Sequence, residues 1–522
     1  MWGKINLLLA NRFWVRAAIP LVFVVSLLLF SWLQVPDKLS DPDSFYHAKL
    51  TAMLRDYGVL REFFWTQESL YKNIFIDHHL GYHLIILPII SLFSNSLLGL
   101  QIVVVLSASF TITTIAWCLK KWRVPYWGFG VLLLLTSSPL LFRLSLGKAP
   151  SLGVGLAVIE YYLISERKNN WLFWFAWFYT WVYSAWLMLP VMAGAVVISN
   201  WLIDKYRDKK IDSNLFGKKN IITVASILGG LVLGITTNPY FPINIKYLFQ
   251  IFKMALTPYY KIVSIGGEWH PVVAIDFLAY AAYPLLVWLL STLVGIVIWK
   301  KLSKLTIGTW FVTVLWLIYT FRAQRQIEYL VPWFILSSGL LMRDWLILCP
   351  IKMWREKVKN FIPRFVYQSF VKYSIALYLI ILIPLGLGRG IINAKTNLNY
   401  GINHNYFKNT AEWLKNNTPA RSVVFQSNWG SFPELWYYND QNWYLTGLDQ
   451  TFMYEYSADK YKLWQEIVDG KKSDFYSEVK NIFNADYFLL EKKFAAALGQ
   501  LNRDARFKKV YQNEEAIIFQ VE

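Results

Sequence analysis

For its length, the sequence has little charge, few acidic residues and almost no cysteine. Only 16% of its 522 residues are charged, whereas soluble globular proteins carry about 25%. Together with a hydrophobic fraction of 56% and a mean hydropathy of +0.34, this shortage of charge excludes an ordinary soluble protein. The two cysteines, Cys118 and Cys349, lie at the ends of apolar runs. They exclude a disulfide framework and a metal site built from thiolates.

Long apolar runs are present instead, from residue 14 to about residue 387, and then they stop. We therefore predict an α-helical polytopic membrane protein with a C-terminal water-soluble domain. The transmembrane domain covers 1–390 and the soluble domain 391–522. Basic residues outnumber acidic ones by 52 to 33, which gives a net charge of +19. Because the basic residues concentrate in short loops between apolar runs, they indicate membrane sidedness, and we predict no nucleic-acid partner.

The loop charges also predict the topology. Lys4, Arg12 and Arg16 precede the first span, which places the N-terminus in the cytoplasm of a multi-pass plasma- or inner-membrane protein. No small-residue cleavage site follows this span, so it is interpreted as an uncleaved anchor. We predict about eleven spans, near 15–34, 97–118, 125–142, 150–165, 170–187, 188–203, 220–236, 273–298, 305–320, 327–342 and 370–388. The stretch 79–93 is interpreted as an interfacial or re-entrant helix, because a further span there would reverse the sidedness of every later basic loop.

This topology gathers polar side chains on the external face of the membrane. The predicted external loops are 35–78, 143–150, 237–272 and 321–327. All six histidines lie in or near them: His47, His78, His79, His83, His270 and His404. A transporter would instead place polar groups near the middle of the membrane. Polar groups at one face, beside an extracytoplasmic soluble domain, are typical of an enzyme that acts on a lipid headgroup.

The C-terminal stretch has the pattern of predicted strands and helices of a small α/β domain. SVVFQSN (422–428), NWYLTGLD (442–449), ADYFLLEK (485–492) and EEAIIFQVE (514–522) have the pattern of short strands. The stretches 405–417 and 460–470 are predicted helices, the second ended by Gly470.

The first external loop contains the stretch DPDSFYHAKL (41–50). Asp43 and His47 are four residues apart, so a helix that begins near Pro42 places them on one face. Here a carboxylate either binds a metal or takes a proton from an acceptor. Capping of the helix by Asp41 or Asp43 is the structural alternative.

The stretch FIDHHLGYHL (75–84) is unusually rich in histidine. It contains Asp77, His78, His79 and His83, and the last two have the i, i+4 spacing of helical metal ligands. With Asp43, they are the candidate ligands for a divalent cation, Mg²⁺ or Mn²⁺. Contact with the phosphate or sugar of a substrate is one alternative, and histidines that only tolerate the membrane interface are another.

Two later external segments carry further candidates. In GGEWHPVV (266–273), paired glycines permit a mobile loop that presents Glu268 and Trp269, although a plain turn into a span is the alternative. FRAQRQIEYLVPW (321–333) puts Arg322 and Arg325 where the positive-inside rule predicts no cations. Guanidinium groups match phosphate oxygens in geometry, which suggests phosphate binding. An ion pair between Arg325 and Glu328 is the structural alternative, and the two roles are compatible.

Together these stretches resemble the GT-C superfamily of integral-membrane glycosyltransferases, and specifically the catalytic subunit of oligosaccharyltransferase, over roughly residues 1–390. DSFYHAK is similar to the first-loop aspartate pattern, GGEWHP to the S-x-S-E-x-x-P loop, and RQIEYLVP to the arginine stretch that meets the donor phosphate. The resemblance implies that Asp43, Glu268 and Arg325 fill those positions. The second external loop begins, as in that family, with an arginine, Arg143.

The sequence also departs from that family. Its second external loop has Gly147, Lys148 and Ala149 where the family has metal-binding carboxylates, which argues against a metal site of that type; Lys148 would offset phosphate charge instead. The W-W-D-Y-G motif is absent, because its counterpart SNWGSFPELWYYN has no Asp, so we do not predict glycosylation of asparagine sequons. Asp449, in GLDQTFMY, is interpreted as structural.

We therefore predict a glycosyltransferase that moves a sugar from a polyprenyl-phosphate or polyprenyl-pyrophosphate donor to a protein, glycan or lipid acceptor on the extracytoplasmic side. Asp43 is the predicted general base, and Glu268 positions the substrates as its loop closes. The predicted donor-phosphate residues are Arg325, Arg322, Arg143 and Lys148, and the predicted substrate-binding residues are His47, Asp77, His78, His79, His83 and Trp269. A transporter or flippase of lipid-linked sugars and a membrane scaffold with an external binding domain remain as alternatives.

Overall fold

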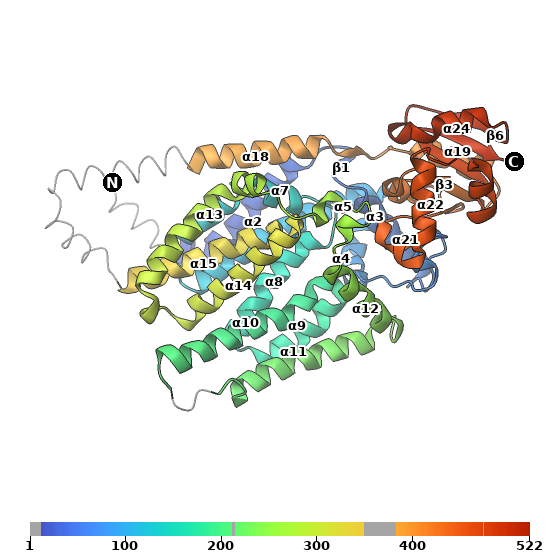
Figure 1. The fold of residues 1–522 in the computed structure, drawn as a ribbon. Coiled ribbons are helices and arrows are strands. Elements are labelled where there is room, and N and C mark those ends of the chain that lie inside the picture. Colours follow the sequence, from blue (N-terminus) through green and yellow to red (C-terminus); the bar gives the residue numbers. More distant parts are fainter. Residues whose placement is uncertain (1–11, 211–213, 349–382, 473) are drawn as a thin grey trace. The chain divides into compact units, whose positions relative to one another are not determined.

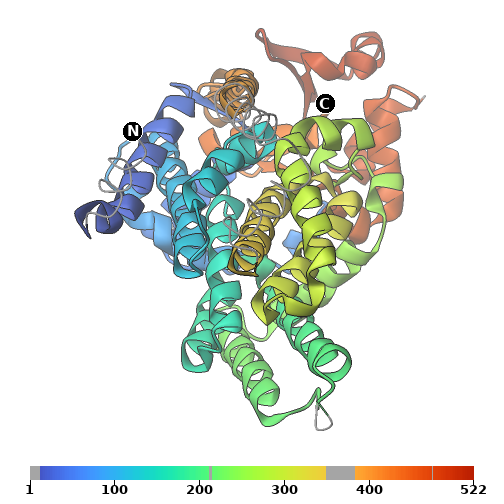
Figure 2. The same cartoon turned by 90° about the vertical axis from the view of Figure 1, so that its left-hand side faces the viewer.

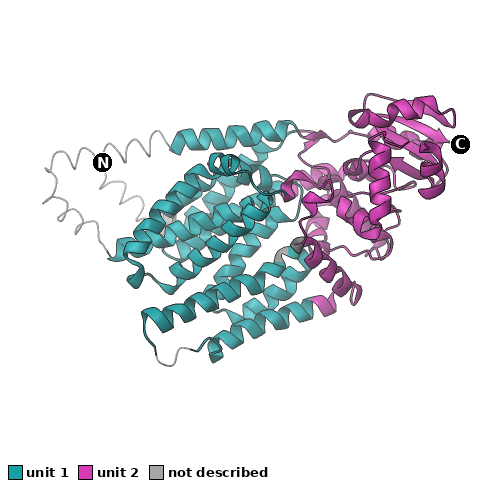
Figure 3. Cartoon of the chain, viewed as in Figure 1, with its two compact units in different colours: residues 1–35, 104–234, 270–400 teal, residues 36–103, 235–269, 401–522 magenta. Residues whose placement is uncertain are grey.

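The chain divides into two units, each with its own packing (Figure 3). The structure, a computed structural model, describes residues 12–210, 214–348, 383–472 and 474–522. Unit 1 comprises 1–35, 104–234 and 270–400, and unit 2 comprises 36–103, 235–269 and 401–522. Each unit is therefore built from three stretches that are distant in sequence.

Unit 1 is a bundle of apolar helices (Figures 1 and 2). Its helices are α2 (Arg12–Leu33), most of α5 (Ser96–Lys121), α6 (Trp127–Leu134), α7 (Ser138–Leu144), α8 (Pro150–Ser165), α9 (Asn169–Val182), α10 (Met188–Leu202), most of α11 (Lys218–Thr237), α13 (Ala274–Val297), α14 (Lys304–Arg322), α15 (Ile327–Leu348) and α18 (Ile383–Asn399). Helix α15 packs against both α13 and α14. Gly230 lets α11 approach α9 closely, because a Cβ there would lie 2.2 Å from the carbonyl oxygen of Phe173.

Unit 1 carries most of the helices that suit a bilayer. In the described part of the chain, seven helices are long and apolar enough to cross a membrane, or eight if the bent pair α6–α7 is one span. This confirms a helical polytopic membrane protein. The predicted span 125–142 forms that pair, bent by 80°, with Pro139 in the first turn of α7.

Other predicted spans differ in length from the structure. The stretches 150–165 and 170–187 contain helices of 16 and 14 residues, shorter than the roughly 20 residues of a full span. Helix α4 (Leu80–Ile90), in the stretch predicted not to span, has 11 residues. The predicted span 370–388 lies mostly outside the described residues.

Unit 2 combines the first loop, the segment 235–269 and the C-terminal stretch. The first two supply α3 (Asp43–Tyr57), α4 and α12 (Ile243–Leu256), and β1 (Lys38–Leu39) pairs with β2 (Ile402–Asn403). The C-terminal stretch contributes α19 (Lys408–Asn417), β3 (Val423–Gln426), α20 (Phe432–Tyr438), β4 (Trp443–Tyr444), α21 (Gln450–Tyr456), α22 (Ala458–Val468), β5 (Tyr487–Glu491), α24 (Leu498–Arg503), β6 (Phe507–Gln512) and β7 (Ala516–Val521).

The C-terminal strands form one mixed sheet in the order β4-β3-β5-β7-β6. Strand β3 is parallel to β4 and β5, whereas β7 is antiparallel to β5 and β6. The four predicted strands and both predicted helices of this stretch are confirmed. The edge strand β6 was not predicted, because Lys508 and Lys509 interrupt its apolar pattern.

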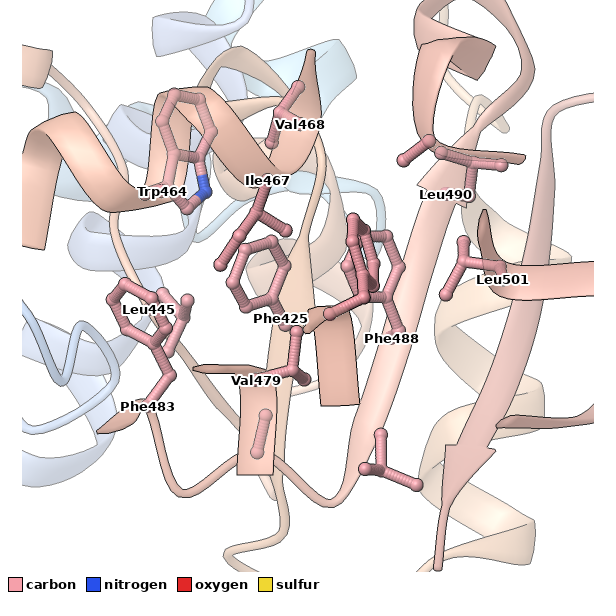
Figure 4. Close-up of a cluster of buried hydrophobic side chains, with 14 of the residues drawn as sticks. Phe425, Leu445, Trp464, Ile467, Val468, Val479, Phe483, Phe488, Leu490 and Leu501 are labelled. Atoms are coloured by element: carbon pink, nitrogen blue, oxygen red, sulfur yellow. The ribbon is translucent and has the colours of Figure 1, made fainter. Parts of the chain in front are cut away.

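One face of this sheet is covered by a hydrophobic core (Figure 4). Phe425 on β3 stacks on Phe488 on β5 with ring centroids 4.6 Å apart. Tyr259 and Val263 join the same buried cluster. The segment 235–269, which carries Glu268, is therefore anchored in the core of unit 2.

Candidate active site

The two aspartates that begin the first loop have different surroundings. Asp41 accepts hydrogen bonds from the backbone N–H of Ser44 at 3.2 Å and from its hydroxyl at 3.0 Å, which stabilises the first turn of α3. Asp43 is the first residue of α3 and is half-buried. The stabilising contact to the helix start therefore comes from Asp41, while Asp43 lies one turn before His47.

Three buried side chains form a hydrogen-bonded chain that ends at His47, one helical turn after Asp43. Asp77 Oδ2 lies 2.7 Å from His83 Nδ1, and His83 Nε2 lies 2.8 Å from His47 Nδ1. The other carboxylate oxygen, Oδ1 of Asp77, accepts from the backbone N–H of His79 at 3.0 Å. Asp77, His83 and His47 are only 5%, 0% and 4% exposed. Helices α3 and α4 pack together, and this packing joins residues that are 36 positions apart.

The remaining histidines of this loop extend the polar cluster. The ring of His79 lies 5.3 Å from that of His47 and 3.9 Å from that of His78, measured between centroids. His78 Nδ1 lies 3.2 Å from the hydroxyl of Tyr247, which lies 3.4 Å from that of Tyr71. Burial lowers the pKa of His78 to about 4, although the charge of Asp77 opposes this shift. His78 is therefore neutral at physiological pH.

Carboxylates from three segments share one electrostatic neighbourhood. Burial, together with the negative charges of Asp43 and Glu268, raises the pKa of Asp449 to about 6, although hydrogen bonds from Thr451 oppose this shift. Burial likewise raises the pKa of Glu434, with the charges of Glu491, Asp43 and Asp41 acting in the same direction. Asp43 and Glu268, which come from two different segments of unit 2, thus each lie close enough to Asp449 for their charges to act on it.

The predicted cation ligands do not fit a metal ion. Both ring nitrogens of His83 are engaged, one with Asp77 and one with His47. Within the described ranges, no three His, Cys, Asp or Glu side chains are grouped so that they could hold a metal ion.

The predicted cations belong to unit 1. Arg143, in the last turn of α7, donates from Nε to Glu328 Oε2 at 2.7 Å, and both side chains are buried. Arg325 lies in the 3₁₀ turn Gln324–Gln326 (η7), where its guanidinium donates to the Tyr183 hydroxyl at 3.4 Å. The side chains of Lys148 and Arg322 are half-buried.

Most of the predicted site residues belong to unit 2, and two residues near them were not singled out from the sequence. Asp43, His47, Asp77, His78, His79, His83 and Glu268 share this unit, and Trp269 follows Glu268 with 36% of its surface exposed. Sequence reasoning did not single out Tyr247 or Glu434, and it gave Asp449 only a structural role. Asp449 has that role, since it accepts from the Thr451 N–H at 2.8 Å at the start of α21. No local pattern marked Tyr247, whose neighbours come from a different segment.

Solved structures match this chain over nearly its whole length. The archaeal oligosaccharyltransferase AglB from Archaeoglobus fulgidus, in complex with an inhibitory peptide and a dolichol-phosphate, has a TM-score of 0.63 at 11% identity, with 98% of this chain and 75% of that one covered. ArnT from Cupriavidus metallidurans, bound to undecaprenyl phosphate, has a TM-score of 0.57 at 12% identity, with 98% and 99% covered. The arabinofuranosyltransferase AftD from mycobacteria has a TM-score of 0.59 at 13% identity, with 97% and 40% covered.

These matches define a fold. The chain is structurally similar to the GT-C glycosyltransferases, as its motifs suggested, and the similarity is not confined to the membrane helices. No protein-family model matches the sequence, and no curated protein matches it either. At identities of 10–13%, the likeness establishes the fold alone.

Proposed function

We propose that this protein is a membrane glycosyltransferase that moves a sugar from a polyprenyl-phosphate or polyprenyl-pyrophosphate donor to an acceptor on the extracytoplasmic side. In this proposal, residues 1–390 form the transmembrane domain, with a cytoplasmic N-terminus and about eleven spans. Residues 391–522 form the extracytoplasmic domain. The acceptor is a protein, a glycan or a lipid.

The choice of donor is supported by the proteins that share the fold. AglB was solved with a dolichol-phosphate and ArnT with undecaprenyl phosphate, so two of the matching proteins hold a polyprenyl phosphate. A third, AftD, is named as an arabinofuranosyltransferase. Transfer of a sugar from a lipid-linked donor agrees with the polyprenyl phosphates held by AglB and ArnT, and with the name of AftD as a glycosyltransferase.

The observation that carries the proposal is the surroundings of Asp43. This half-buried carboxylate begins α3, one turn before His47. Its negative charge acts to raise the pKa of Asp449, His78 and Glu434. A general base must be accessible to a substrate and held by rigid neighbours. Asp43 meets both requirements because it is half-buried on a packed helix, whereas Asp41 is only 8% exposed and stabilises the start of that helix through Ser44.

In the proposed reaction, the acceptor nucleophile attacks the anomeric carbon and loses its proton to Asp43. The bond from that carbon to the phosphate oxygen breaks, and its electron pair leaves with the lipid phosphate. Arg325, helped by Arg322, Arg143 and Lys148, stabilises the charge that grows on this phosphate. Glu268 and Trp269 position the substrates. The proposed substrate-binding part of the site also includes His47, Asp77, His78, His79 and His83.

The test follows release of the lipid phosphate. The full-length protein in nanodiscs is incubated with a panel of radiolabelled polyprenyl-phosphate sugars, with and without EDTA. We expect release by the wild type and a loss of 100-fold or more in Asp43→Asn, because general-base catalysis contributes about 10²–10⁴. Asp56→Asn, in the last turns of the same helix but 48% exposed, is the matched control and should release at the wild-type rate.

Four outcomes bear on the proposal or on part of it. Equal release by Asp43→Asn and wild type would exclude Asp43 as the base. Donor binding without release, even with candidate acceptors added, would favour a transporter or flippase of lipid-linked sugars. No donor binding at all would favour a scaffold. Release that EDTA abolishes would show that a divalent cation takes part.

A further inference from the structure

We infer that the Asp77–His83–His47 chain receives the proton that Asp43 takes from the acceptor, and that the acceptor nucleophile is therefore a hydroxyl. This inference rests on the proposed function, and it names the substrate class of the same site. The carrying observation is a continuous line of hydrogen bonds, of 2.7 Å and 2.8 Å, through side chains that are at most 5% exposed.

The hydrogen bonds determine which nitrogen of each ring carries the hydrogen. An ionised carboxylate only accepts, so His83 donates from Nδ1 to Asp77 and its Nε2 becomes an acceptor. His47 must then donate from Nδ1 to His83 Nε2. In this tautomer Nε2 of His47 carries no hydrogen and is the basic nitrogen of the ring. Asp77 thus sets the tautomer of a ring that it does not touch.

The chain is held on more than one side. Asp77 Oδ1 accepts from the backbone N–H of His79, so the carboxylate cannot rotate without losing that bond. The rings of Tyr82 and His47 pack nearly perpendicular to one another with centroids 5.6 Å apart. The titratable groups around His47, from its own helix and from those packed on it, are Asp41, Asp43, Tyr46, Asp77, His78, His79, Tyr82, His83, Tyr247 and Glu434.

The hydroxyl oxygen of the acceptor forms a bond to the anomeric carbon, and the carbon–phosphate oxygen bond breaks with its electron pair on the phosphate. The hydroxyl proton moves to Asp43 and then to Nε2 of His47. The resulting imidazolium is shared with His83 and stabilised by the carboxylate of Asp77, which itself stays ionised. The proton leaves to water with the product.

A hydroxyl is the class of acceptor that needs a chain of side chains to receive its proton. An alcohol becomes a strong nucleophile only as its proton leaves, and an imidazole is well matched to hold that proton near neutral pH. A phosphate acceptor would arrive already ionised and would have no proton to deliver. His47, His83 and Asp77 are therefore assigned as positioning residues that act through Asp43.

The sharpest variant is Asp77→Asn. Because the backbone N–H of His79 holds the Oδ1 position, the amide oxygen takes that place and the NH₂ group faces His83 Nδ1. His83 then carries its hydrogen on Nε2 and donates to His47 Nδ1. This moves the hydrogen of His47 to Nε2 and removes the accepting nitrogen, while the heavy atoms keep their positions.

The experiment uses the full-length protein in nanodiscs with the labelled polyprenyl-phosphate sugar that the wild type consumes. Methanol and the more acidic trifluoroethanol, at low concentration, are the probe acceptors. We expect Asp77→Asn to lower kcat for transfer to methanol by about 10²–10⁴ and to trifluoroethanol by at least tenfold less, with KM for the donor little changed. His404→Gln, a buried histidine of unit 2 outside this chain, is the control and should match the wild type on both alcohols.

A second measurement reads the tautomers directly and does not depend on turnover. Because the whole protein has only six histidines, ¹⁵N-histidine NMR of the full-length protein can resolve the individual imidazole rings. We expect Nδ1–H on His47 and His83 in the wild type and Nε2–H on both in Asp77→Asn. Unchanged tautomers, unchanged kcat, or equal loss with both alcohols would overturn the relay.

The remaining outcomes separate this inference from the proposed function. Lipid-phosphate release by the wild type without alkyl glycoside from either alcohol would overturn the hydroxyl acceptor but not the glycosyltransferase. A wild type that releases no lipid phosphate from any donor would overturn the proposed function and this inference with it.

Discussion

The guanidinium Nε of Arg143 lies 2.7 Å from the carboxylate Oε2 of Glu328, 185 residues further along the chain, and the two side chains are 9% and 2% exposed. The pair joins the end of α7 to the beginning of α15, two helices that pack together in unit 1. A buried charge is tolerated there because it is paired. Glu328 therefore contributes to the fold, whatever role Arg143 has toward a donor.

Breaking this pair should be costly. Arg143→Met leaves the Glu328 carboxylate buried without this cation, and we expect it to destabilise the protein by about 3–5 kcal/mol. The double variant Arg143→Met, Glu328→Leu should lose clearly less than the two single losses added together. SDS-induced unfolding of the wild type, both single variants and the double variant measures this coupling. Additive losses would show that the contact is not energetically important.

Asp449 should make stability depend on pH in an unusual direction. Its carboxyl titrates near 3.8 in the unfolded chain, but burial and then the charges of Asp43 and Glu268 raise its pKa to about 6 in the folded protein. The folded state holds this proton more tightly, so its contribution to stability is complete below about pH 4 and is lost as pH rises through about 6.

The matched variant is Asp449→Asn, which still accepts from the Thr451 N–H but cannot ionise. We expect its thermal midpoint to gain on that of the wild type between about pH 4 and pH 7, measured in the same detergent. A difference between the two midpoints that is constant over this range would contradict the assignment.

Gly447 is required by close packing inside unit 2. A Cβ at this position would lie 2.2 Å from the ring of Phe432, which is fully buried. Gly447→Ala should therefore destabilise the protein by about 1–3 kcal/mol. Gly499→Ala, on α24, adds a Cβ that meets no atom within 4 Å and should be neutral or stabilise by up to about 1 kcal/mol. Thermal unfolding compares the two, and similar midpoints would show that the ring can move aside.

Glu455 anchors the segment that leads to Glu268. It accepts hydrogen bonds from Lys253 and Tyr259, and from Gln250 at 3.1 Å. Glu455→Ala should increase hydrogen exchange of the backbone amides in 243–269, because three contacts to that segment are lost together. Glu466→Ala, on α22 and 46% exposed, is the control and should leave this exchange unchanged. Unchanged exchange in Glu455→Ala would mean that Tyr259 and Val263 hold the segment by apolar packing alone.

Much of the fold was predictable because its signals are local. Apolar runs such as 97–118 and 273–298 predicted helices that the structure contains as α5 and α13. Short runs such as SVVFQSN predicted β3 in the same way. Lengths were less predictable, since the stretch 125–142 has the composition of a span but bends by 80°. Hydropathy does not distinguish a straight helix from a broken one.

The sequence by itself determined the membrane class, the α/β character of the C-terminal stretch and the spacing that puts Asp43 one helical turn before His47. These properties depend on backbone periodicity, which short windows encode. Only the tertiary structure decided that His47 meets His83, that Glu328 meets Arg143, and that the strands take the order β4-β3-β5-β7-β6. Such contacts join positions far apart in the chain, and they form only when whole helices and strands pack, so no local pattern specifies them.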